Sequence, residues 1–405
     1  MPTQKKRKIN VRTPEVMERV QAEVARHYES SIVEKVKAQG GVFTIGNTTI
    51  RLAKQFGFCY GVERAIDLAY ASRRVFPDNR IFLIGEIIHN PEVNQQLVEM
   101  NIVSLPWEEI TEHYDNLGKD DVVIVPAFGA PVSYMEKLTK QGCMVIDTTC
   151  GDVMKVWRRV KSYAKESITS IIHGKTGHEE TRATASRALG DDKTGHYIIV
   201  LTLDDVNYVC DYLKNGGNRE EFLDRFENSL SPGFDPELHL KKVGVANQTT
   251  MLKSETEEIQ RLVAAALKER DGDHENFKVF DTICGATQER QDALFDMLRD
   301  KMDLLLVVGG YNSSNTSHLV EIGEKNLPTF FIRGARCLTS MEEVAHFDLH
   351  QKAEVKSEYP DRLFSKDELV VGITAGASCP NNLIENTILK VFSLRGIDEA
   401  TVRSA

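Results

Sequence analysis

Apolar runs of four or five residues recur along most of the chain, and the segments between them carry apolar residues at spacings of three and four. The first pattern is typical of buried strands and the second of amphipathic helices. Strands that alternate with helices form parallel sheets, so the sequence predicts an α/β fold. The predicted strands lie at 81–84, 122–125, 168–172, 197–200, 304–308, 329–332 and 369–373, and a final helix is expected from 382 to about 394.

Three cysteines stand at equivalent places in this pattern. Cys59, Cys150 and Cys284 each follow an apolar, strand-like run and each open a helix-like run. Two of them lie in near-copies of one pentapeptide, at 147–151 and 281–285. The period of about a hundred residues is too long for a solenoid. It indicates three copies of one βαβ unit, each with a thiol at the carboxyl end of a strand.

The spacing of the cysteines suggests the domain limits. Cys59 and Cys150 lie 91 residues apart, whereas Cys150 and Cys284 lie 134 apart, so the second unit carries an excess of 43 residues. Turn-rich sequence places this insertion at about 204–242. We expect a helical N-terminal extension over 1–49, then α/β units around a shared centre over 50–149, 150–283 and 284–405, the last with a C-terminal helix.

The expected N-terminal extension carries two helix-start signals. Thr13 precedes Pro14, which suits a capping threonine and a proline in the first helical turn, and Ser31 is expected to cap a second helix. We expect these helices to pack on the outside of the fold, with a dimer contact as the alternative. The basic run at 5–8 is interpreted as a solvated tail, with a localisation signal or a polyanion contact as the alternative.

Composition narrows the class of protein. The chain has 405 residues, of which 41% are hydrophobic and 27% charged, as in ordinary soluble proteins. Its formal net charge of −10 argues against general nucleic-acid binding and against an anionic membrane surface. No apolar run is long enough for a transmembrane helix, and the N-terminus lacks the apolar segment of a secretory signal. Seven cysteines, mostly far apart, fit a reducing compartment, so we expect a cytoplasmic protein.

Three thiols at the starts of three helices allow several interpretations. Helix N-termini carry partial positive charge and free N–H groups, which favour thiolates and metal ligation. The set could hold zinc, although the sequence has no C-x-x-C pair, or an iron–sulfur cluster with three cysteine ligands and one iron open to substrate. Three buried cysteines retained after duplication are the remaining interpretation.

The segments that follow the strands are rich in hydroxyl, amide and histidine side chains and poor in lysine and arginine. Loops at the carboxyl ends of parallel strands are where such sheets bind ligands. Neutral donors and helix N-termini suit a diphosphate group, whereas the sequence has no P-loop for a nucleoside triphosphate. Taken singly, the turn at 312–315 also has a structural interpretation as a helix cap, His89 and His178 as structural histidines, and Glu180 as a solvated acid at a helix start. The segments lie at 86–91, 173–181, 247–250, 309–316 and 374–378.

Five motifs together resemble those of the LytB/IspH family of 4-hydroxy-3-methylbut-2-enyl diphosphate reductases. They stand at 58–62 (FCYGV), 147–150 (DTTC), 281–284 (DTIC), 312–315 (NSSN) and 374–378 (TAGAS). The resemblance runs from Ile50 to Leu394 with the motifs in order. The N-terminal extension and the insertion are similar to the longer form found in oxygenic phototrophs. Because no plastid transit peptide is evident, a free-living cell or a mature form in the plastid stroma is implied.

The resemblance implies a pseudo-threefold trefoil around one [4Fe–4S] cluster per chain, bound by Cys59, Cys150 and Cys284. It implies the reductive dehydroxylation of (E)-4-hydroxy-3-methylbut-2-enyl diphosphate to isopentenyl diphosphate and dimethylallyl diphosphate. This is the last step of the non-mevalonate (MEP) isoprenoid pathway. Reduced ferredoxin or flavodoxin would supply the electrons, because no flavin or nicotinamide fingerprint is visible. A monomer or a homodimer is expected.

The resemblance also implies roles for single residues. Glu180 matches the acid of the proton-delivery position, with His178 beside it, and Thr249 matches a hydroxyl that relays or orients near the substrate alcohol. We expect burial to raise the pKa of Glu180, because a proton donor works best with a pKa near the ambient pH. The residues expected to contact the substrate are His89, His178, Thr249, Ser313, Ser314, Asn315 and Ser378.

One position departs from the family pattern. Shorter members carry a histidine before a glycine in the second loop of the first unit, and it contacts the diphosphate. Here Phe128 precedes Gly129, and a phenyl ring cannot donate a hydrogen bond, so we leave Phe128 out of the expected site. The cysteines that match no ligand position are Cys143, Cys210, Cys337 and Cys379.

Three rival interpretations remain at this point. An aconitase-like hydratase also uses a three-cysteine cluster with an open iron, but it consumes no electrons. An iron–sulfur redox sensor or electron-transfer module would leave the polar loops without a role. A zinc-stabilised structural protein would contain neither iron nor sulfide.

Overall fold

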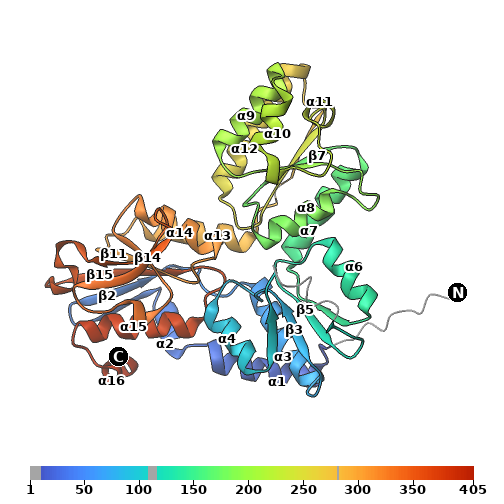
Figure 1. Ribbon diagram of the computed structural model, residues 1–405. Coiled ribbons are helices and arrows are strands. Elements are labelled where there is room, and N and C mark those ends of the chain that lie inside the picture. Colours follow the sequence, from blue (N-terminus) through green and yellow to red (C-terminus); the bar gives the residue numbers. More distant parts are fainter. Residues whose placement is uncertain (1–10, 108–115, 281) are drawn as a thin grey trace.

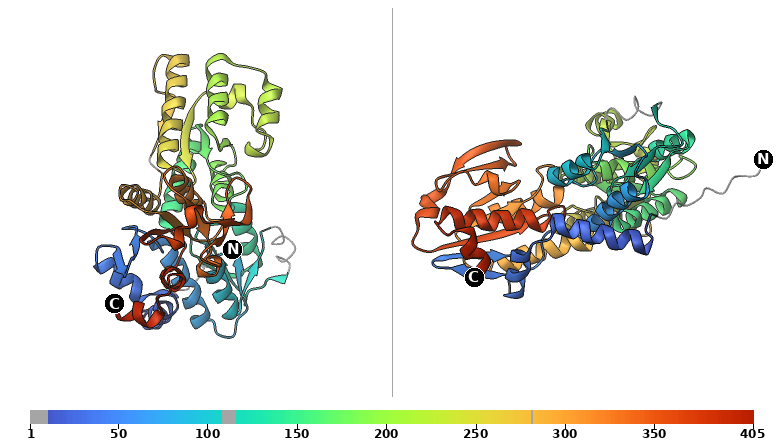
Figure 2. Two further views of the ribbon diagram at one scale, coloured as in Figure 1. Left: turned by 90° about the vertical axis from the view of Figure 1, so that its left-hand side faces the viewer. Right: turned by 90° about the horizontal axis from the view of Figure 1, so that it is seen from below.

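Three α/β lobes meet at one centre in the computed structural model, which describes residues 11–107, 116–280 and 282–405 (Figure 1). Each lobe contains one sheet of four or five mainly parallel strands, which confirms the predicted class of three similar α/β domains. In the left-hand view of Figure 2, the second lobe extends away from the other two. The basic run at 5–8 and Asp281 lie outside the described residues.

The first lobe has a parallel sheet with the strand order β4-β3-β5-β6. Two of its strands, β3 and β5, have the predicted bounds, and β5 is buried along its whole length. The strands are β3 (Ile81–Ile84), β4 (Ile102–Leu105), β5 (Val122–Val125) and β6 (Met144–Asp147), and the helices are α3 (Tyr60–Val75), α4 (Pro91–Glu99) and α6 (Val132–Gln141).

The second lobe has a parallel sheet with the order β10-β9-β7-β8. The expected insertion is helical, and its longest helix, α9, packs against α12. The strands are β7 (Thr169–His173), β8 (Tyr197–Val200), β9 (Val243–Asn247) and β10 (Phe277–Val279). The helices are α7 (Gly151–Lys165), α8 (Glu179–Ala188), α9 (Leu203–Asn215), α10 (Arg219–Arg225), α11 (Pro236–His239) and α12 (Lys253–Asp271).

The third lobe has a five-stranded sheet with the order β1-β2-β15-β11-β12. Its strands are β1 (Val42–Ile45), β2 (Thr48–Leu52), β11 (Leu304–Val308), β12 (Thr329–Ile332) and β15 (Leu369–Ala375), beside a hairpin of β13 (Glu343–Asp348) and β14 (Ala353–Glu358) that the apolar pattern does not predict. Its helices are α13 (Gly285–Met297), α14 (Ser314–Glu324), α15 (Asn381–Leu394) and α16 (Glu399–Ser404).

The start of the first unit differs from the division expected at residue 50. Strand β2 pairs in parallel with β15, so residues 48–52 extend the sheet of the third lobe. The physical reason is burial, because Ile50 and Leu52 lie in the apolar core of that lobe. The chain therefore adds β1 and β2 to the sheet of the third lobe before it forms the sheet of the first lobe.

The N-terminal helices α1 (Pro14–Tyr28) and α2 (Ser31–Ala38) pack against α3 and α15. Thr13 is at the N-cap position of α1 and Pro14 is its first residue, as expected, but the Thr13 side chain makes no capping hydrogen bond. The expectation that Ser31 caps α2 is wrong by one residue, because the Ser30 Oγ accepts the hydrogen bond from the Val33 N–H at 3.0 Å. Across the described ranges, the structure has no helix with the length and apolar character of a membrane span.

Candidate functional site

Each of the three predicted cysteines is the N-cap of a helix. Cys59 precedes α3, Cys150 precedes α7 and Cys284 precedes α13, and all three have extended backbone angles. Free N–H groups at a helix start favour a thiolate at the N-cap. The predicted strand–cysteine–helix arrangement is thus confirmed for the helix side in all three copies.

The three thiols line one cavity between the lobes. All are free, and Gly61 lies between two of them: a Cβ at that position would be 2.6 Å from the Cys150 Sγ and 3.9 Å from the Cys59 Sγ. Burial raises the pKa of the Cys150 thiol and raises that of Cys284 to about 12. Both shifts describe thiols without a bound metal.

The donor set fits an iron–sulfur cluster better than a single zinc ion. Zinc holds sulfur at about 2.3 Å, which keeps its sulfur ligands within about 4 Å of one another. Among the described residues, only His89, His178 and Glu179 bring three ligand atoms within 4.8 Å of one another, and the three cysteine sulfurs do not. A multi-iron group spans such a wider set of thiolates, and the absence of a side chain on Gly61 leaves room beside the sulfurs.

Glu180 and Thr249 form a buried pair on the wall of the same cavity. The Thr249 backbone N–H donates to the Glu180 Oε1 at 2.6 Å, and the Thr249 hydroxyl donates to the Oε2 at 2.9 Å. Burial outweighs these bonds and raises the pKa of Glu180 to about 7, which confirms the expected direction. The backbone N–H of Cys284 donates to the Thr249 carbonyl at 3.2 Å, so this pair is joined to a cysteine helix.

Residues of the third lobe line the cavity with hydroxyl and amide groups. Ser313 is the N-cap of α14, so Ser314 and Asn315 occupy the first turn, where backbone N–H groups are unpaired. The Asn315 Oδ1 accepts from the Ala377 N–H at 2.9 Å, while its Nδ2 is buried without a hydrogen-bond partner among the described residues. Ser378 donates to the His89 carbonyl at 3.1 Å. This wall can bind an anion through neutral donors.

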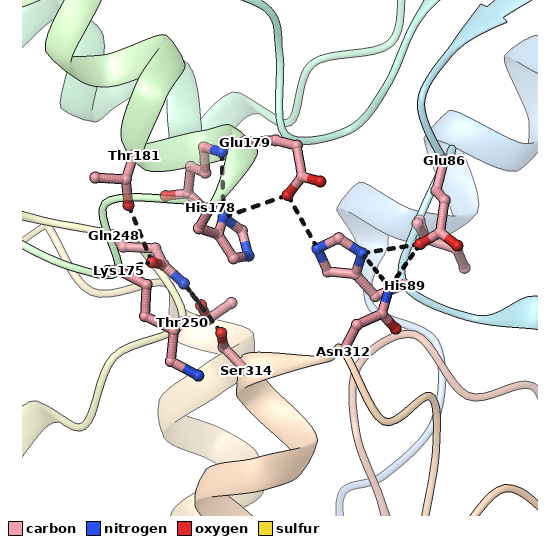
Figure 3. A network of polar contacts seen from close by, with 12 residues as sticks. Glu86, His89, Lys175, His178, Glu179, Thr181, Gln248, Thr250, Asn312 and Ser314 are labelled. Carbon is pink, nitrogen blue, oxygen red and sulfur yellow. Dashed lines mark hydrogen bonds and ion pairs between the residues drawn. The ribbon is translucent and has the colours of Figure 1, made fainter. Parts of the chain in front are cut away.

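The two predicted histidines have different surroundings. The His178 Nδ1 accepts from the Glu180 N–H at 3.1 Å, which leaves the Nε2 to carry the proton, and burial lowers the pKa of His178 to about 3. His89 lies between two carboxylates, Glu86 and Glu179 (Figure 3). Burial alone would lower the pKa of His89, but these carboxylates raise it to about 9.

Phe128, which we left out of the expected site because it cannot donate to phosphate, lies on the wall of the cavity. Its ring stacks on that of His89 with centroids 4.2 Å apart and planes inclined by 20°. A flat ring cannot donate to an anion, but it can cover a neighbouring imidazole. Cys379 is fully buried and is not among the described residues that line the cavity, as expected for a packing residue.

Four further residues of the polar loops were not among the predicted site residues, although one of them, Asn312, opens the motif at 312–315. They are Glu86, Glu179, Gln248 and Asn312. Glu86 and Glu179 reach His89 from two lobes, and Asn312 donates to the Glu86 Oε2 at 2.8 Å from the third. Gln248 accepts from Thr181 and donates towards Ser314 at 3.3 Å (Figure 3). Each stands within three residues of a predicted site residue, but that proximity alone does not separate them from ordinary loop residues.

Comparison with known proteins is consistent with this site. Residues 50–392 match the family model described as LytB protein. The chain belongs to this family. A relative from Thermosynechococcus vestitus, named 4-hydroxy-3-methylbut-2-enyl diphosphate reductase, is 45% identical over 385 residues, which are 94% of this chain and 93% of that protein. A relative of the same name from Gloeobacter violaceus is 44% identical over 396 residues, which are 95% and 92% of the two chains.

Solved structures of the family share the architecture. A structure of (E)-4-hydroxy-3-methyl-but-2-enyl diphosphate reductase, the terminal enzyme of the non-mevalonate pathway, matches with a TM-score of 0.52 and 27% identity over 85% of this chain and 99% of that chain. A reductase from Plasmodium falciparum matches with a TM-score of 0.61 over 86% and 90% of the two chains. Its identity of 23% supports the fold alone. The resemblance of the motifs to the LytB/IspH family is thus confirmed.

Proposed function

We propose that this chain removes the hydroxyl group of (E)-4-hydroxy-3-methylbut-2-enyl diphosphate in a two-electron, two-proton reduction. The products are isopentenyl diphosphate and dimethylallyl diphosphate, and the reaction is the last step of the non-mevalonate isoprenoid pathway. The observation that carries the proposal is one cavity lined by the three N-cap cysteines, the Glu180–Thr249 pair and a wall of neutral donors. Relatives that match nearly the whole chain carry the name of this reductase. Their names therefore support a reductase rather than a hydratase or a redox sensor.

Membership of the family supports an iron–sulfur cluster, and we propose that Cys59, Cys150 and Cys284 hold one [4Fe–4S] cluster per chain. Three thiols at helix N-termini in one cavity support this assignment. When bound, a cluster with one open iron supplies single electrons and a Lewis acid for the substrate's hydroxyl group.

The opposite wall would hold the diphosphate. The first turn of α14 offers backbone N–H groups, Asn315 offers its Nδ2, which has no partner among the described residues, and Ser313 and Ser314 offer hydroxyl groups. Ser378 would turn its hydroxyl from the His89 carbonyl to the diphosphate. A diphosphate carries about three negative charges near pH 7, and a helix N-terminus contributes about half a positive charge. His89, held between carboxylates, would add a full positive charge.

Glu180 and Thr249 would transfer a proton to the hydroxyl group of the substrate. With a pKa of about 7, Glu180 exists in both forms near neutral pH, so it can give a proton and regain one. The Thr249 hydroxyl lies 2.9 Å from the Glu180 Oε2 and also lines the cavity. When Glu180 is protonated, this hydroxyl can accept from the carboxyl group and offer its own hydrogen to the substrate alcohol.

The electron donor would be reduced ferredoxin or flavodoxin, which a reduced viologen dye replaces in an assay. The deciding experiment supplies anaerobically purified protein with the dye and the hydroxylated butenyl diphosphate, and identifies products by mass. We expect substrate-dependent dye oxidation with both isoprenoid diphosphates formed. A cluster-loaded protein that consumes no electrons would refute the reductase, and a protein with zinc but no sulfide would refute the cluster as well.

A further inference from the structure

Both ring nitrogens of His89 face carboxylate oxygens. The Nδ1 lies 3.1 Å from the Glu86 Oε2, and the Nε2 lies 3.5 Å from the Glu179 Oε2 (Figure 3). A carboxylate only accepts hydrogen bonds, so the Nδ1 needs a proton to be held by Glu86, and the negative charge of Glu179 favours a second proton on the Nε2. The arrangement selects the doubly protonated imidazolium, although the ring is only 6% exposed.

The two carboxylates act on His89 in different ways, one through a hydrogen bond and the other through its charge. Glu86 forms a hydrogen bond with the Nδ1 and also accepts from the Asn312 amide nitrogen at 2.8 Å. The same amide nitrogen lies 3.2 Å from the Nδ1, and because the charged ring and the amide are both donors there, Glu86 is the acceptor that they share. Glu179 is too far for a well-formed hydrogen bond, and the Nε2 has no such partner among the described residues. Glu179 therefore supplies charge without occupying the donor, and the Nε2–H stays available for a ligand in the cavity.

The other groups around His89 support a positive charge. Phe128 covers one face of the ring at 4.2 Å, and an aromatic face attracts a cation. His178 meets it edge-on at 5.2 Å and stays neutral, because burial lowers its pKa to about 3. The charged groups that the structure places against His89 are thus Glu86 from its own loop and Glu179 from the start of α8.

We propose that Glu179 is a positioning residue that keeps His89 as an imidazolium with its Nε2–H free for the diphosphate group of the substrate. This inference rests on the proposed function for the identity of the ligand. It gives a physical role to the departure at Phe128, where the expected second histidine is missing. With Phe128 at that position, the single histidine His89 supplies the positive charge on this side of the cavity around neutral pH.

The charge of His89 can be measured without turnover. Protein labelled with ¹⁵N in its histidines is titrated by NMR, and the His89 signal is assigned by its loss in His89→Asn. We expect the signal to titrate near pH 9 in the wild type and about one to three units lower in Glu179→Gln, because a lost opposite charge shifts a pKa by that much. Glu179→Asp should recover part of the shift. An unchanged titration in Glu179→Gln would overturn the proposal.

The consequence for the ligand is tested with inorganic pyrophosphate, by calorimetry of the cluster-loaded protein. At pH 8.5, roughly, we expect Glu179→Gln to bind pyrophosphate at least about tenfold more weakly, with a smaller loss at lower pH where His89 is still protonated. In the reductase assay, the KM for the substrate should rise with kcat nearly unchanged. Equal affinity at every pH would contradict the role of Glu179 in diphosphate binding.

A matched control removes a carboxylate from another buried histidine. Glu321 lies 2.8 Å from the Nδ1 of His318, which is not among the described residues that line the cavity. Glu321→Gln should leave the His89 titration and the pyrophosphate affinity unchanged. If the wild type consumes no electrons with the substrate, the proposed function fails, while the His89 titration still decides the role of Glu179.

Discussion

The two oxygens of the Glu180 carboxylate are both held by one residue, Thr249, through its backbone N–H at 2.6 Å and its hydroxyl at 2.9 Å. The side chain is 1% exposed, so neither oxygen is solvated in the way an ordinary glutamate is. Two hydrogen bonds stabilise the carboxylate and burial destabilises it. Burial has the larger effect, so the pKa of Glu180 is raised. The pair thus has a pKa suited to proton transfer in a cavity that also contains the thiols.

Glu180→Gln should abolish most of the turnover and leave the cluster in place. The amide keeps the shape of the side chain and can still accept from the Thr249 N–H, but it cannot deliver a proton. We expect kcat to fall by about 10²–10⁴-fold, the usual contribution of a general acid. The measurement is dye oxidation, with iron and sulfide content determined on the same sample. Glu257→Gln, at an exposed glutamate of α12, is the control, and near-normal turnover in Glu180→Gln would remove Glu180 from the mechanism.

The raised pKa of Glu180 also predicts how stability depends on pH. The folded protein holds this proton up to about pH 7, against an ordinary value of 4.5, so its stabilising effect is complete below pH 4.5 and is lost as the pH rises through 7. Over that window the wild type should lose up to about 3 kcal/mol that Glu180→Gln does not lose. Calorimetry at about pH 5.5 and about pH 8 should therefore show the variant gaining in Tm relative to the wild type at the higher pH. A constant difference in Tm would show that Glu180 titrates with an ordinary pKa.

The local pattern of the chain predicted much of the fold. Four-residue apolar runs such as 81–84 and 122–125 match β3 and β5 residue by residue, because buried parallel strands exclude polar residues on both faces. The cysteine N-caps were predictable, because at each cysteine a continuous apolar run gives way to apolar residues at spacings of three and four. The pairing of β2 with β15 did not follow, because partners more than 300 residues apart leave no local signal in either strand.

The chemistry of the site was predictable only in part. Cys284, Glu180 and Ser314 could be selected from the sequence, because the residues next to each of them match the family pattern. All three line the cavity. Glu179 and Phe128 act through His89, which belongs to another loop, so their roles depend on how the loops meet. Phe128 was misjudged because hydrogen-bonding capacity was the only property considered, whereas its ring face is what contacts the site.

Phe128→Leu should weaken substrate binding without slowing the chemical step. Leucine fills a similar space but lacks the aromatic face that covers the His89 ring at 4.2 Å. A cation on an aromatic face gains about 0.5–1 kcal/mol, so we expect the KM to rise roughly two- to fivefold with kcat unchanged. Steady-state kinetics near pH 7 measure both. Phe295→Leu, at an exposed position of α13, is the control, and an unchanged KM in Phe128→Leu would mean that the stacking does not contribute to binding.

Gly61→Ala should reduce the iron and sulfide content of the protein. A Cβ at this position would lie 2.6 Å from the Cys150 Sγ, which is closer than a carbon and a sulfur atom approach without a bond. Because Gly61 lies in α3, the helix backbone fixes the position of that Cβ. Either the sulfur or the helix must shift, and both move a proposed ligand. Gly285→Ala is the matched control, because this glycine also follows a cysteine at a helix start but has no atom within 4 Å of an added Cβ. Iron, sulfide and visible absorbance of the two variants, prepared side by side without oxygen, give the comparison. We expect Gly285→Ala to contain as much iron and sulfide as the wild type. Gly61→Ala should contain only a minor fraction of that amount. Equal iron and sulfide contents would show that the thiols of Cys59 and Cys150 have no fixed positions around the cluster.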